Sequence, residues 1–320
     1  MRPARPVTGA RIVREHLAPL LYFLQVHLLF ATVVGLGAWA LTSLHGTSVT
    51  ARFWVWTAAS LNFVIPLGGF VDGFGATDLP GAQQLGLLAA IDLGIGRHLS
   101  WALAVAALWA GGMALMVARL WLRIRRERRA ERGRTRHGTP DFRVHGVAVH
   151  FTDGAHSPAV AGIVRSQICL PRGIERLLSA HELDAVLLHE VTHAKRRDNL
   201  LRLTHEALLC VLWFHPLLWF IGQRLALYRE LSCDETVLRR SSGRFLVSAL
   251  AKLAPPESSL VLRSAAGSLL RQRLERLLAA EPPPAWPLRN TLMIAAFSVL
   301  LVTAVCFTVA HTACCLVPVR

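Results

Sequence analysis

Long apolar stretches without a single Asp, Glu, Lys or Arg constrain the fold of this 320-residue chain more than any other feature. A helix needs roughly 20 apolar residues to cross a bilayer. Four stretches approach or exceed that length, and they cover residues 17–44, 53–71, 101–118 and 290–310. We therefore expect a mainly α-helical, multi-pass membrane protein whose spans contact the lipid bilayer.

A fifth apolar stretch, residues 207–223, is interrupted by His215-Pro216. Proline disrupts a helix beyond its first turn. The stretch therefore fits a span, a re-entrant segment or a buried helix packed under its neighbour, and the sequence leaves these alternatives open.

Basic residues dominate the charge of the chain, which is +15 in total, and they are densest directly after the third apolar stretch. Arg and Lys beside a span mark its cytoplasmic side, so the run from Arg123 to Arg134 predicts that residues 123–289 are cytoplasmic. The acidic loop at 72–92 is then expected outside. A nucleic-acid site would need aromatic residues among the arginines, and none is present there, so we expect no direct contact with nucleic acid.

The charges and the span count disagree about the side of the N-terminus. Arginines at the N-terminus favour the cytoplasm, whereas three spans before a cytoplasmic domain would place it outside, unless residues 85–95 add a crossing. We expect three regions: an N-terminal membrane region at 1–122 with about three spans, a cytoplasmic domain at 123–289, and a C-terminal span with a short tail at 290–320.

The region after residue 123 shows strand patterns first and helical patterns later. Residues 142–151 and 160–170 are short, rich in β-branched residues and bounded by Gly and Pro, which predicts strands. Helical periodicity then runs from Ser179 to about Arg240. We therefore expect an α+β domain between the membrane regions.

The helical part has recognisable boundaries. Ser179 with Glu182 forms a capping-box pattern, in which the hydroxyl and the carboxylate satisfy backbone N–H groups of the first turn. Pro255-Pro256 should end the helical region, and a shorter helix is expected at 269–278. The prolines at 282–284 should separate it from the last span.

One predicted helix carries the sequence His189-Glu190-Val-Thr-His193. Residues four apart share a helix face, so His189 and His193 can bind one Zn²⁺ through their ring nitrogens. Glu190 lies beside them, where a carboxylate can take a proton from a zinc-activated water. The motif predicts a zinc-dependent hydrolase with Glu190 as its catalytic base.

A catalytic zinc site also needs a third protein ligand. Our candidate is Glu230, in Arg229-Glu-Leu-Ser-Cys-Asp-Glu235, and Asp234 on the same face could accept the second ring N–H of a liganding histidine. Spacing alone leaves four rivals for the third ligand, which are Asp198, His205, Glu206 and His215. His215 and Tyr228 are also candidate donors to a developing oxyanion.

Several ordered motifs are spread over roughly half of the chain. They are Ser157-Pro158 with Gly162, Leu170-Pro171, the segment from Leu188 to Leu200, the segment from Trp213 to Trp219, the segment from Arg229 to Glu235 and, more weakly, the segment from Arg271 to Leu277. This ordered set resembles the BlaR/MecR-type membrane zinc metallopeptidases, the antibiotic-sensing signal transducers and their relatives.

The resemblance implies a gluzincin-like zinc domain that faces the cytoplasm from a bacterial inner membrane. It implies one Zn²⁺ per chain held by His189, His193 and Glu230, with Glu190 as base and Asp234 in support. It also implies a protein substrate, in the form of a winged-helix transcriptional repressor inactivated after an external stimulus. Self-cleavage and assembly into a homo-oligomer are further expectations.

Two features depart from the family pattern. His215 precedes Pro216 where relatives often carry Asn, and only about ten residues follow Ala310. That tail is too short for a penicillin-binding sensor domain, so we do not expect direct β-lactam sensing. Two alternatives to a signalling peptidase stay open. One is a non-catalytic receptor or scaffold that keeps the motif, and the other is a constitutive quality-control or prenyl-protein endopeptidase.

Overall fold

A computed structural model describes residues 18–43, 47–63, 99–132, 140–153, 157–253, 265–279 and 288–316. The chain divides into two compact units. The first comprises Met1–His45, Ala58–Leu115 and Thr291–Arg320, and the second comprises Gly46–Thr57 and Met116–Asn290. The three regions expected at 1–122, 123–289 and 290–320 stay predictions. The N-terminal arginines, the loop at 72–92, the candidate crossing at 85–95 and the prolines at 255–256 and 282–284 lie outside the described residues.

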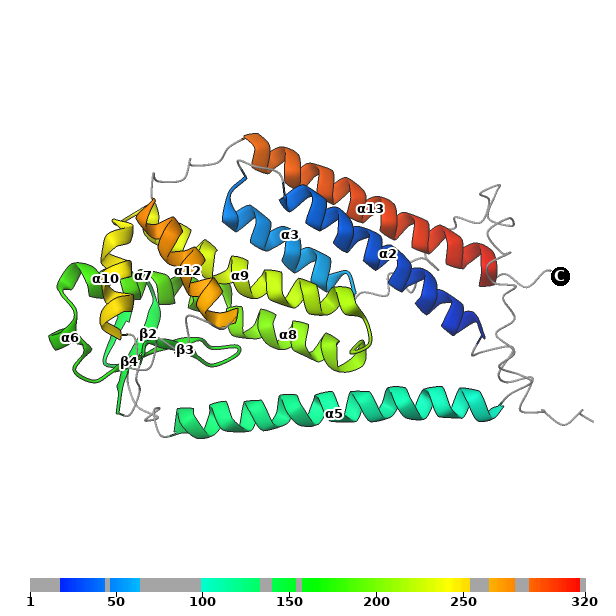
Figure 1. The fold of residues 1–320 in the computed structure, drawn as a ribbon, viewed down its shortest axis with the longest axis horizontal. Coiled ribbons are helices and arrows are strands. Elements are labelled where there is room, and N and C mark those ends of the chain that lie inside the picture. Colours follow the sequence, from blue (N-terminus) through cyan, green and yellow to red (C-terminus); the bar gives the residue numbers. More distant parts are fainter. Residues whose placement is uncertain are drawn as a thin grey trace, which may run out of the picture. The chain divides into compact units, whose positions relative to one another are not determined.

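Long apolar helices form the first unit, and three of them continue into the second. They are α2 (Ala18–Thr42), α3 (Val49–Leu61), α5 (Leu99–Arg132) and α13 (Leu288–Leu316). Helices α2 and α13 lie side by side in the first unit (Figure 1), and a Cβ added at Gly37 would come within 2.1 Å of Leu300 Cδ2. Glycine therefore permits the close approach of these two helices.

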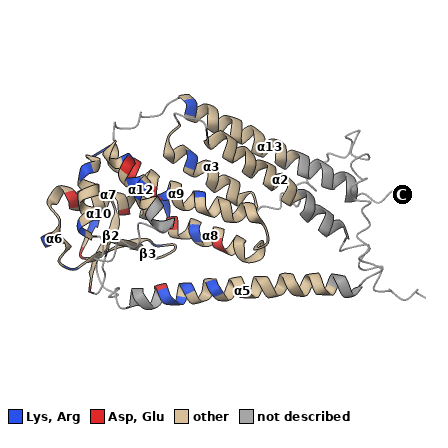
Figure 2. Cartoon of the chain, in the orientation of Figure 1, with Lys and Arg blue, Asp and Glu red and all other residues tan. Residues whose placement is uncertain are grey.

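Among the described residues, one helical segment is long and apolar enough to cross a membrane, Leu103–Glu127 in α5. No residue of the apolar window of this segment is buried by the rest of the described chain. Figure 2 shows that the charged residues of α5 gather towards its C-terminal end. Shorter apolar helices cover His27–Thr42 and Leu288–Ala304. The predicted stretch at 53–71 is helical as far as Leu61, and residues 64–71 lie outside the described ones.

Four described strands of the second unit form one sheet in the order β1-β2-β4-β3. The strands are β1 (Phe142–Val144), β2 (Val147–Thr152), β3 (Ala159–Ala161) and β4 (Gln167–Pro171). Strands β2 and β4 are parallel, and the two outer pairs are antiparallel. Strand β3 is therefore an edge of the described sheet.

Each of the two predicted strands is in fact a pair of strands separated by a turn. His145 and Gly146 both have positive φ, 47° and 85°, which is the conformation of a two-residue hairpin turn. In the second pair the chain turns after Gly162, whose φ is 86°, and a Cβ there would meet the Arg165 carbonyl oxygen at 2.3 Å. Only glycine fits that position without strain.

Helices make up the rest of the second unit: α6 (Ile174–Leu177), α7 (Ala180–Arg196), α8 (Asp198–Val211), α9 (Pro216–Leu238), α10 (Gly243–Leu253) and α12 (Ala265–Leu278). The predicted capping box begins α7. The Ser179 hydroxyl accepts from the Glu182 N–H, and the Glu182 carboxylate accepts from the Ser179 N–H at 2.7 Å.

The helical region predicted from Ser179 to Arg240 is broken twice. Arg197 adopts a left-handed conformation (φ 57°, ψ 46°) that ends α7, and a turn before Pro216 ends α8 and begins α9. The apolar stretch at 207–223 is thus divided between two helices and does not form a single span-length helix. Proline stands at the first position of α9, where its missing N–H has no helical partner to lose.

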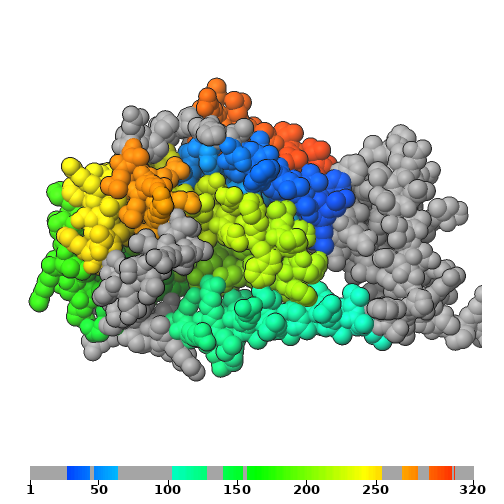
Figure 3. Space-filling model, viewed as in Figure 1, coloured from blue at the N-terminus to red at the C-terminus, as the bar shows by residue number. Residues whose placement is uncertain are grey.

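The core of the second unit lies between the sheet and a layer of helices. Helix α7 contacts β2, β3 and β4, and it also contacts α9 and α10. Helices α10 and α12 pack together, as the yellow and orange surfaces in Figure 3 show. The core residues are Val149, Ile168 and Leu170 from the sheet, Ala185, Val186, Leu188 and Val191 from α7, and Val237, Leu246, Ala249 and Leu277 from the outer helices. This packing makes α7 the central helix of the unit.

The buried Glu182 carboxylate predicts how stability depends on pH. Hydrogen bonds from Lys252, at 2.7 Å, and then from Ser248 and Ser179 lower its pKa from 4.5 to about 2. Because the folded pKa is the lower one, this contribution to stability is complete above the unfolded pKa and is lost as the pH falls towards 2. We expect the thermal midpoint of the wild type to fall more steeply between about pH 5 and pH 2 than that of Glu182→Gln.

The exposed Glu175→Gln is the matched control and should keep the wild-type slope. Identical slopes for wild type and Glu182→Gln would contradict the assignment.

Candidate metal centre

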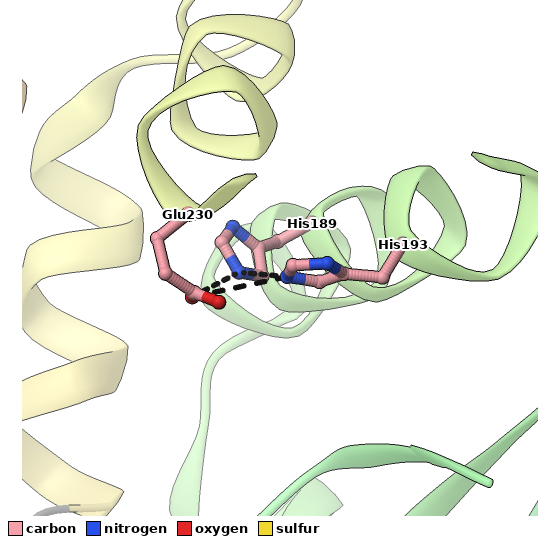
Figure 4. A group of neighbouring side chains, drawn as sticks. All are labelled: His189, His193 and Glu230. Carbon is pink, nitrogen blue, oxygen red and sulfur yellow. Dashed lines mark hydrogen bonds and ion pairs between the residues drawn. The ribbon is translucent and has the colours of Figure 1, made fainter. Parts of the chain in front are cut away.

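Three potential ligand atoms converge between α7 and α9. His189 and His193 project from the same face of α7, and Glu230 reaches them from α9 (Figure 4). The Nε2 atoms of the two histidines are 3.1 Å apart. Glu230 Oε2 lies 3.7 Å from His189 Nε2 and 3.8 Å from His193 Nε2. These three residues can therefore offer two imidazole nitrogens and a carboxylate oxygen to one metal ion.

Each histidine has a carboxylate at its other ring nitrogen. His193 Nδ1 lies 2.6 Å from Asp198 Oδ2, and His189 Nδ1 lies 3.1 Å from Asp234 Oδ1. The second contact is poorly aligned for a hydrogen bond, because His189 Nδ1 makes no bond of regular geometry. A carboxylate at Nδ1 fixes the tautomer that leaves Nε2 available to a metal.

Two arginines neutralise these carboxylates. Arg196 donates to both oxygens of Asp198 at 2.6 Å, and Arg273 donates to both oxygens of Asp234 at 2.8 Å. Arg273 also approaches Glu230 Oε2, at 3.3 Å. Bidentate pairing of this kind compensates the cost of burying a carboxylate.

The charge pairing is reflected in the pKa values. Burial by itself would lower the pKa of His189, but the neighbouring carboxylates of Asp234 and Glu230 outweigh it and raise the pKa to about 9. Burial would raise the pKa of Glu230, yet the two histidines and Arg273 hold it well below its usual range. In the same way, the pKa of Asp234 is lowered against the effect of burial, chiefly by His189 and Arg273. The site thus holds carboxylates that stay ionised and attract a cation.

A cavity of about 460 Å³ opens on these residues. Glu190, the next residue after His189, lines it together with the three candidate ligands. Val160 of the edge strand β3 lines the wall together with Ser157 and Pro158, which precede the strand, and an apolar side is formed by Val186, Leu246, Leu250, Leu253 and Leu270. The cavity thus has the size of a ligand-binding pocket, with the three candidate ligands and Glu190 on one side and apolar side chains on the other.

The rivals for the third ligand have other roles in the second unit. Asp198 contacts Nδ1 of His193, away from the point where the Nε2 atoms meet. Glu206 pairs with Arg123 of α5 at 2.6 Å. His205 packs against Gly222, where an added Cβ would be 2.6 Å from its Nε2. His215 precedes the first residue of α9.

The two residues considered as oxyanion donors are not brought to the cavity. Neither His215 nor Tyr228 is among the described residues that line it. The described cations on its wall are Arg202, Arg229 and Arg273. That expectation therefore finds no support in the geometry.

Sequence reasoning missed two supporting residues. Asp198 was considered as a rival ligand and not as a support of a histidine, although it lies within reach of His193 because Arg197 turns the chain back. Arg273 received no role, although it belongs to the weak motif from Arg271 to Leu277. The position of Arg273 inside that motif was the available signal.

Comparison with known proteins agrees with the motifs. A family described as BlaR1 peptidase M56 matches residues 89–277, which is more than half of the chain. The chain belongs to the BlaR1 peptidase M56 family. This confirms the resemblance drawn from the motifs, and the matched residues extend from before α5 through the sheet to Leu277 in α12.

Two members of this family illustrate the similarity. The regulatory protein BlaR1 of Bacillus licheniformis is 41% identical over 83 residues, which are 26% of this chain and 14% of that protein. The methicillin resistance mecR1 protein of Staphylococcus aureus is 27% identical over 93 residues, which are 29% of this chain and 16% of that protein. The aligned part is thus less than a fifth of either relative.

The charge pairing of Arg273 predicts a large effect on stability. Arg273→Gln removes the cation from Asp234 and Glu230, and breaking a buried pair costs about 3–5 kcal/mol. We expect a marked fall in the thermal midpoint of the metal-free protein. Measuring the metal-free form keeps any loss of bound metal out of the comparison.

Arg271→Gln is the matched control on the same helix. Its side chain is 79% exposed, so the replacement should leave the thermal midpoint close to that of the wild type. Equal shifts for the two variants would show that Arg273 is not a buried partner.

Proposed function

We propose that this chain is a membrane-bound zinc endopeptidase whose metal ligands are His189, His193 and Glu230. The observation that carries the proposal is the convergence of these three donor atoms in a cavity that Glu190 also lines. Membership of a peptidase family supports the reaction type. One zinc ion per chain is the expected content.

The donor set fits zinc. Ligand atoms around a tetrahedral zinc ion stand about 3.3 Å apart when the bonds are about 2.0–2.1 Å long. The separations of 3.1, 3.7 and 3.8 Å among the donor atoms lie close to this value. Two nitrogens and one carboxylate oxygen leave a fourth position for water or substrate, as catalytic sites require.

The residues around the ion divide the chemical work. A bound zinc ion supplies Lewis acidity, which lowers the pKa of water and polarises a peptide carbonyl. Glu190 takes the proton of the attacking water on its carboxylate and returns it to the leaving amine. Asp234 and Asp198 hold the rings of His189 and His193 with Nε2 towards the cavity.

The cavity supports a protein substrate bound as an extended strand. Strand β3 is an edge, and Val160 on it lines the cavity. The Asn199 amide donates to the carbonyl oxygens of Val160 and Gly162 at 3.0 Å and so fixes this edge beside the ligands. An extended peptide that pairs with the edge would place one apolar side chain against Leu246 and Leu250.

A multi-pass arrangement, with the peptidase domain facing the cytoplasm of a bacterial inner membrane, is part of the proposal. The long apolar segment of α5 and the shorter apolar helices of α2 and α13 support several crossings. The arginines that follow the apolar part of α5 support the cytoplasmic side for residues 123–289.

The proposed role is transmembrane signalling that inactivates a winged-helix transcriptional repressor. The names of the two relatives, a regulatory protein and a methicillin resistance protein, support regulation as the context. Self-cleavage and homo-oligomer formation belong to the same proposal.

Replacing Glu190 should separate metal binding from catalysis. Glu190→Gln removes the base but leaves the three ligands in place. We expect a full complement of zinc by elemental analysis and a loss of hydrolysis of at least about 10²-fold, measured on a fluorogenic peptide mixture. His189→Ala should lose both zinc and hydrolysis.

Glu206→Gln is the matched control, since it changes a carboxylate of α8 that pairs with Arg123; it should keep both properties. Undiminished hydrolysis by Glu190→Gln would exclude Glu190 as the base. A folded wild type without zinc would contradict the peptidase and favour a non-catalytic receptor.

Thiol labelling tests the side of the domain. Ser242 is exposed at the start of α10, so Ser242→Cys introduces an accessible thiol there. We expect a membrane-impermeant maleimide to label this variant only after the cells are permeabilised, and the parent chain gives the background. Labelling in intact cells would place the domain outside.

A further inference from the structure

The first two turns of α3 belong to the second unit although they are far from it in sequence. Residues 46–57 cluster with residues 116–290. The N-terminus of α3 is anchored there, because the Ser48 N–H donates to Asn290 Oδ1 at 2.7 Å and Asn290 Nδ2 donates to the Ser48 hydroxyl at 2.9 Å. Asn290 is fully buried. This part of an apolar helix is therefore held on the same body as the metal centre.

A first contact joins α3 to the helix that carries Glu230. The backbone N–H of Thr50 and its hydroxyl both donate to Glu235 Oε2, at 2.9 and 2.6 Å. An N–H in the first turn of a helix has no helical acceptor, so the Glu235 carboxylate caps α3. Glu235 follows Asp234, which supports His189.

A second contact joins α3 to the residue that neutralises Asp198. The guanidinium carbon of Arg196 lies 3.9 Å from the centre of the Phe53 ring, over its face. Both residues are shielded from solvent, since Phe53 is 2% exposed and the Arg196 side chain 9%. A desolvated cation over an aromatic face is held more firmly than an exposed one.

Arg196 transmits this contact to the candidate metal centre. Besides Asp198 it donates to the Ser232 hydroxyl and to the Arg229 carbonyl oxygen of α9. The N–H groups of the Arg196 guanidinium thus donate to acceptors of α8 and α9, while the face of the guanidinium packs on α3. Asp198 in turn contacts His193 at 2.6 Å.

We propose that the first two turns of α3 position the metal ligands. Phe53 acts on His193 through Arg196 and Asp198. Thr50 acts on His189 through Glu235, which is next to Asp234 in sequence. The inference rests on the proposed zinc site. It makes Phe53 and Thr50 positioning residues that touch neither metal nor substrate. Because α3 reaches the supports of both histidines, a displacement of this apolar helix changes the metal affinity of the site.

Zinc affinity of the full-length protein tests the proposal, measured by competition with a chromophoric chelator. Phe53→Leu keeps an apolar side chain but removes the ring face, and we expect zinc binding to weaken about fivefold to tenfold. Phe53→Tyr keeps the face and should bind zinc as the wild type does. Asp198→Asn sets the scale, because loss of a carboxylate that orients a ligand costs about 10–100-fold.

Phe297→Leu is the control for loss of a buried phenylalanine, because Phe297 belongs to the first unit. Thermal unfolding of the metal-free variants verifies that each is folded. If Phe53→Leu does not fold, Thr50→Val replaces it, since this change removes the hydroxyl donor to Glu235 at nearly constant volume. Weaker zinc binding by Thr50→Val supports the proposal, and unchanged zinc binding overturns it.

The outcomes separate the two proposals. Equal affinity for wild type, Phe53→Leu and Phe297→Leu overturns the positioning role alone. No zinc in folded wild type overturns the zinc site and the positioning role with it. Weaker binding confined to Phe53→Leu, with Phe53→Tyr and Phe297→Leu unchanged, supports the role of α3.

Discussion

Two buried carboxylates, Asp198 and Asp234, each join an arginine to a histidine, and the candidate metal centre depends on these bridges. A carboxylate taken out of water is costly unless it is paired and hydrogen-bonded. Arg196 and Arg273 supply that pairing, so each carboxylate can stay ionised beside an imidazole. Without the arginines, the aspartates would gain little by remaining charged, and the histidines would lose the partners that direct Nε2 towards the cavity.

The fold serves these bridges by bringing four helices to one place. Helix α7 is held against the sheet by its apolar face, which leaves its histidines facing α9. Helix α8 contributes Asp198, α9 contributes Glu230 and Asp234, and α12 contributes Arg273. Three of these helices, α7, α9 and α12, also contribute residues to the apolar core. The packing of the core therefore sets the positions of these charged side chains, and its density limits how far each of the helices can move.

Local sequence patterns predicted the parts of the site that lie on one helix or repeat along it. The capping box and the two histidines of α7 follow from spacing along a helix. Spacing left Glu230 with four rivals as the third ligand, and the resemblance to the family selected it, with Asp234 one turn further on the same face of α9. Features set by tertiary contact or by unusual turns were missed. The turn at His145-Gly146, which divides a predicted strand, was missed because a histidine with positive φ leaves no pattern in composition. Arg197 ends a helix where glycine or asparagine usually would, and Arg273 finds Asp234 across a distance in sequence that no periodicity encodes.

The second unit is discontinuous in sequence, and this affects how the chain can be made. Thr50 bonds to a residue 185 positions later, and Ser48 to one 242 positions later. During synthesis α3 therefore emerges long before its partners. The N-terminus of α3 lacks its hydrogen-bond partners Glu235 and Asn290 until α9 and the start of α13 have been translated. Closing such long loops is slow relative to helix formation. Completion of the second unit is consequently a late event in biogenesis, because Asn290, the partner of Ser48, lies in the last apolar helix.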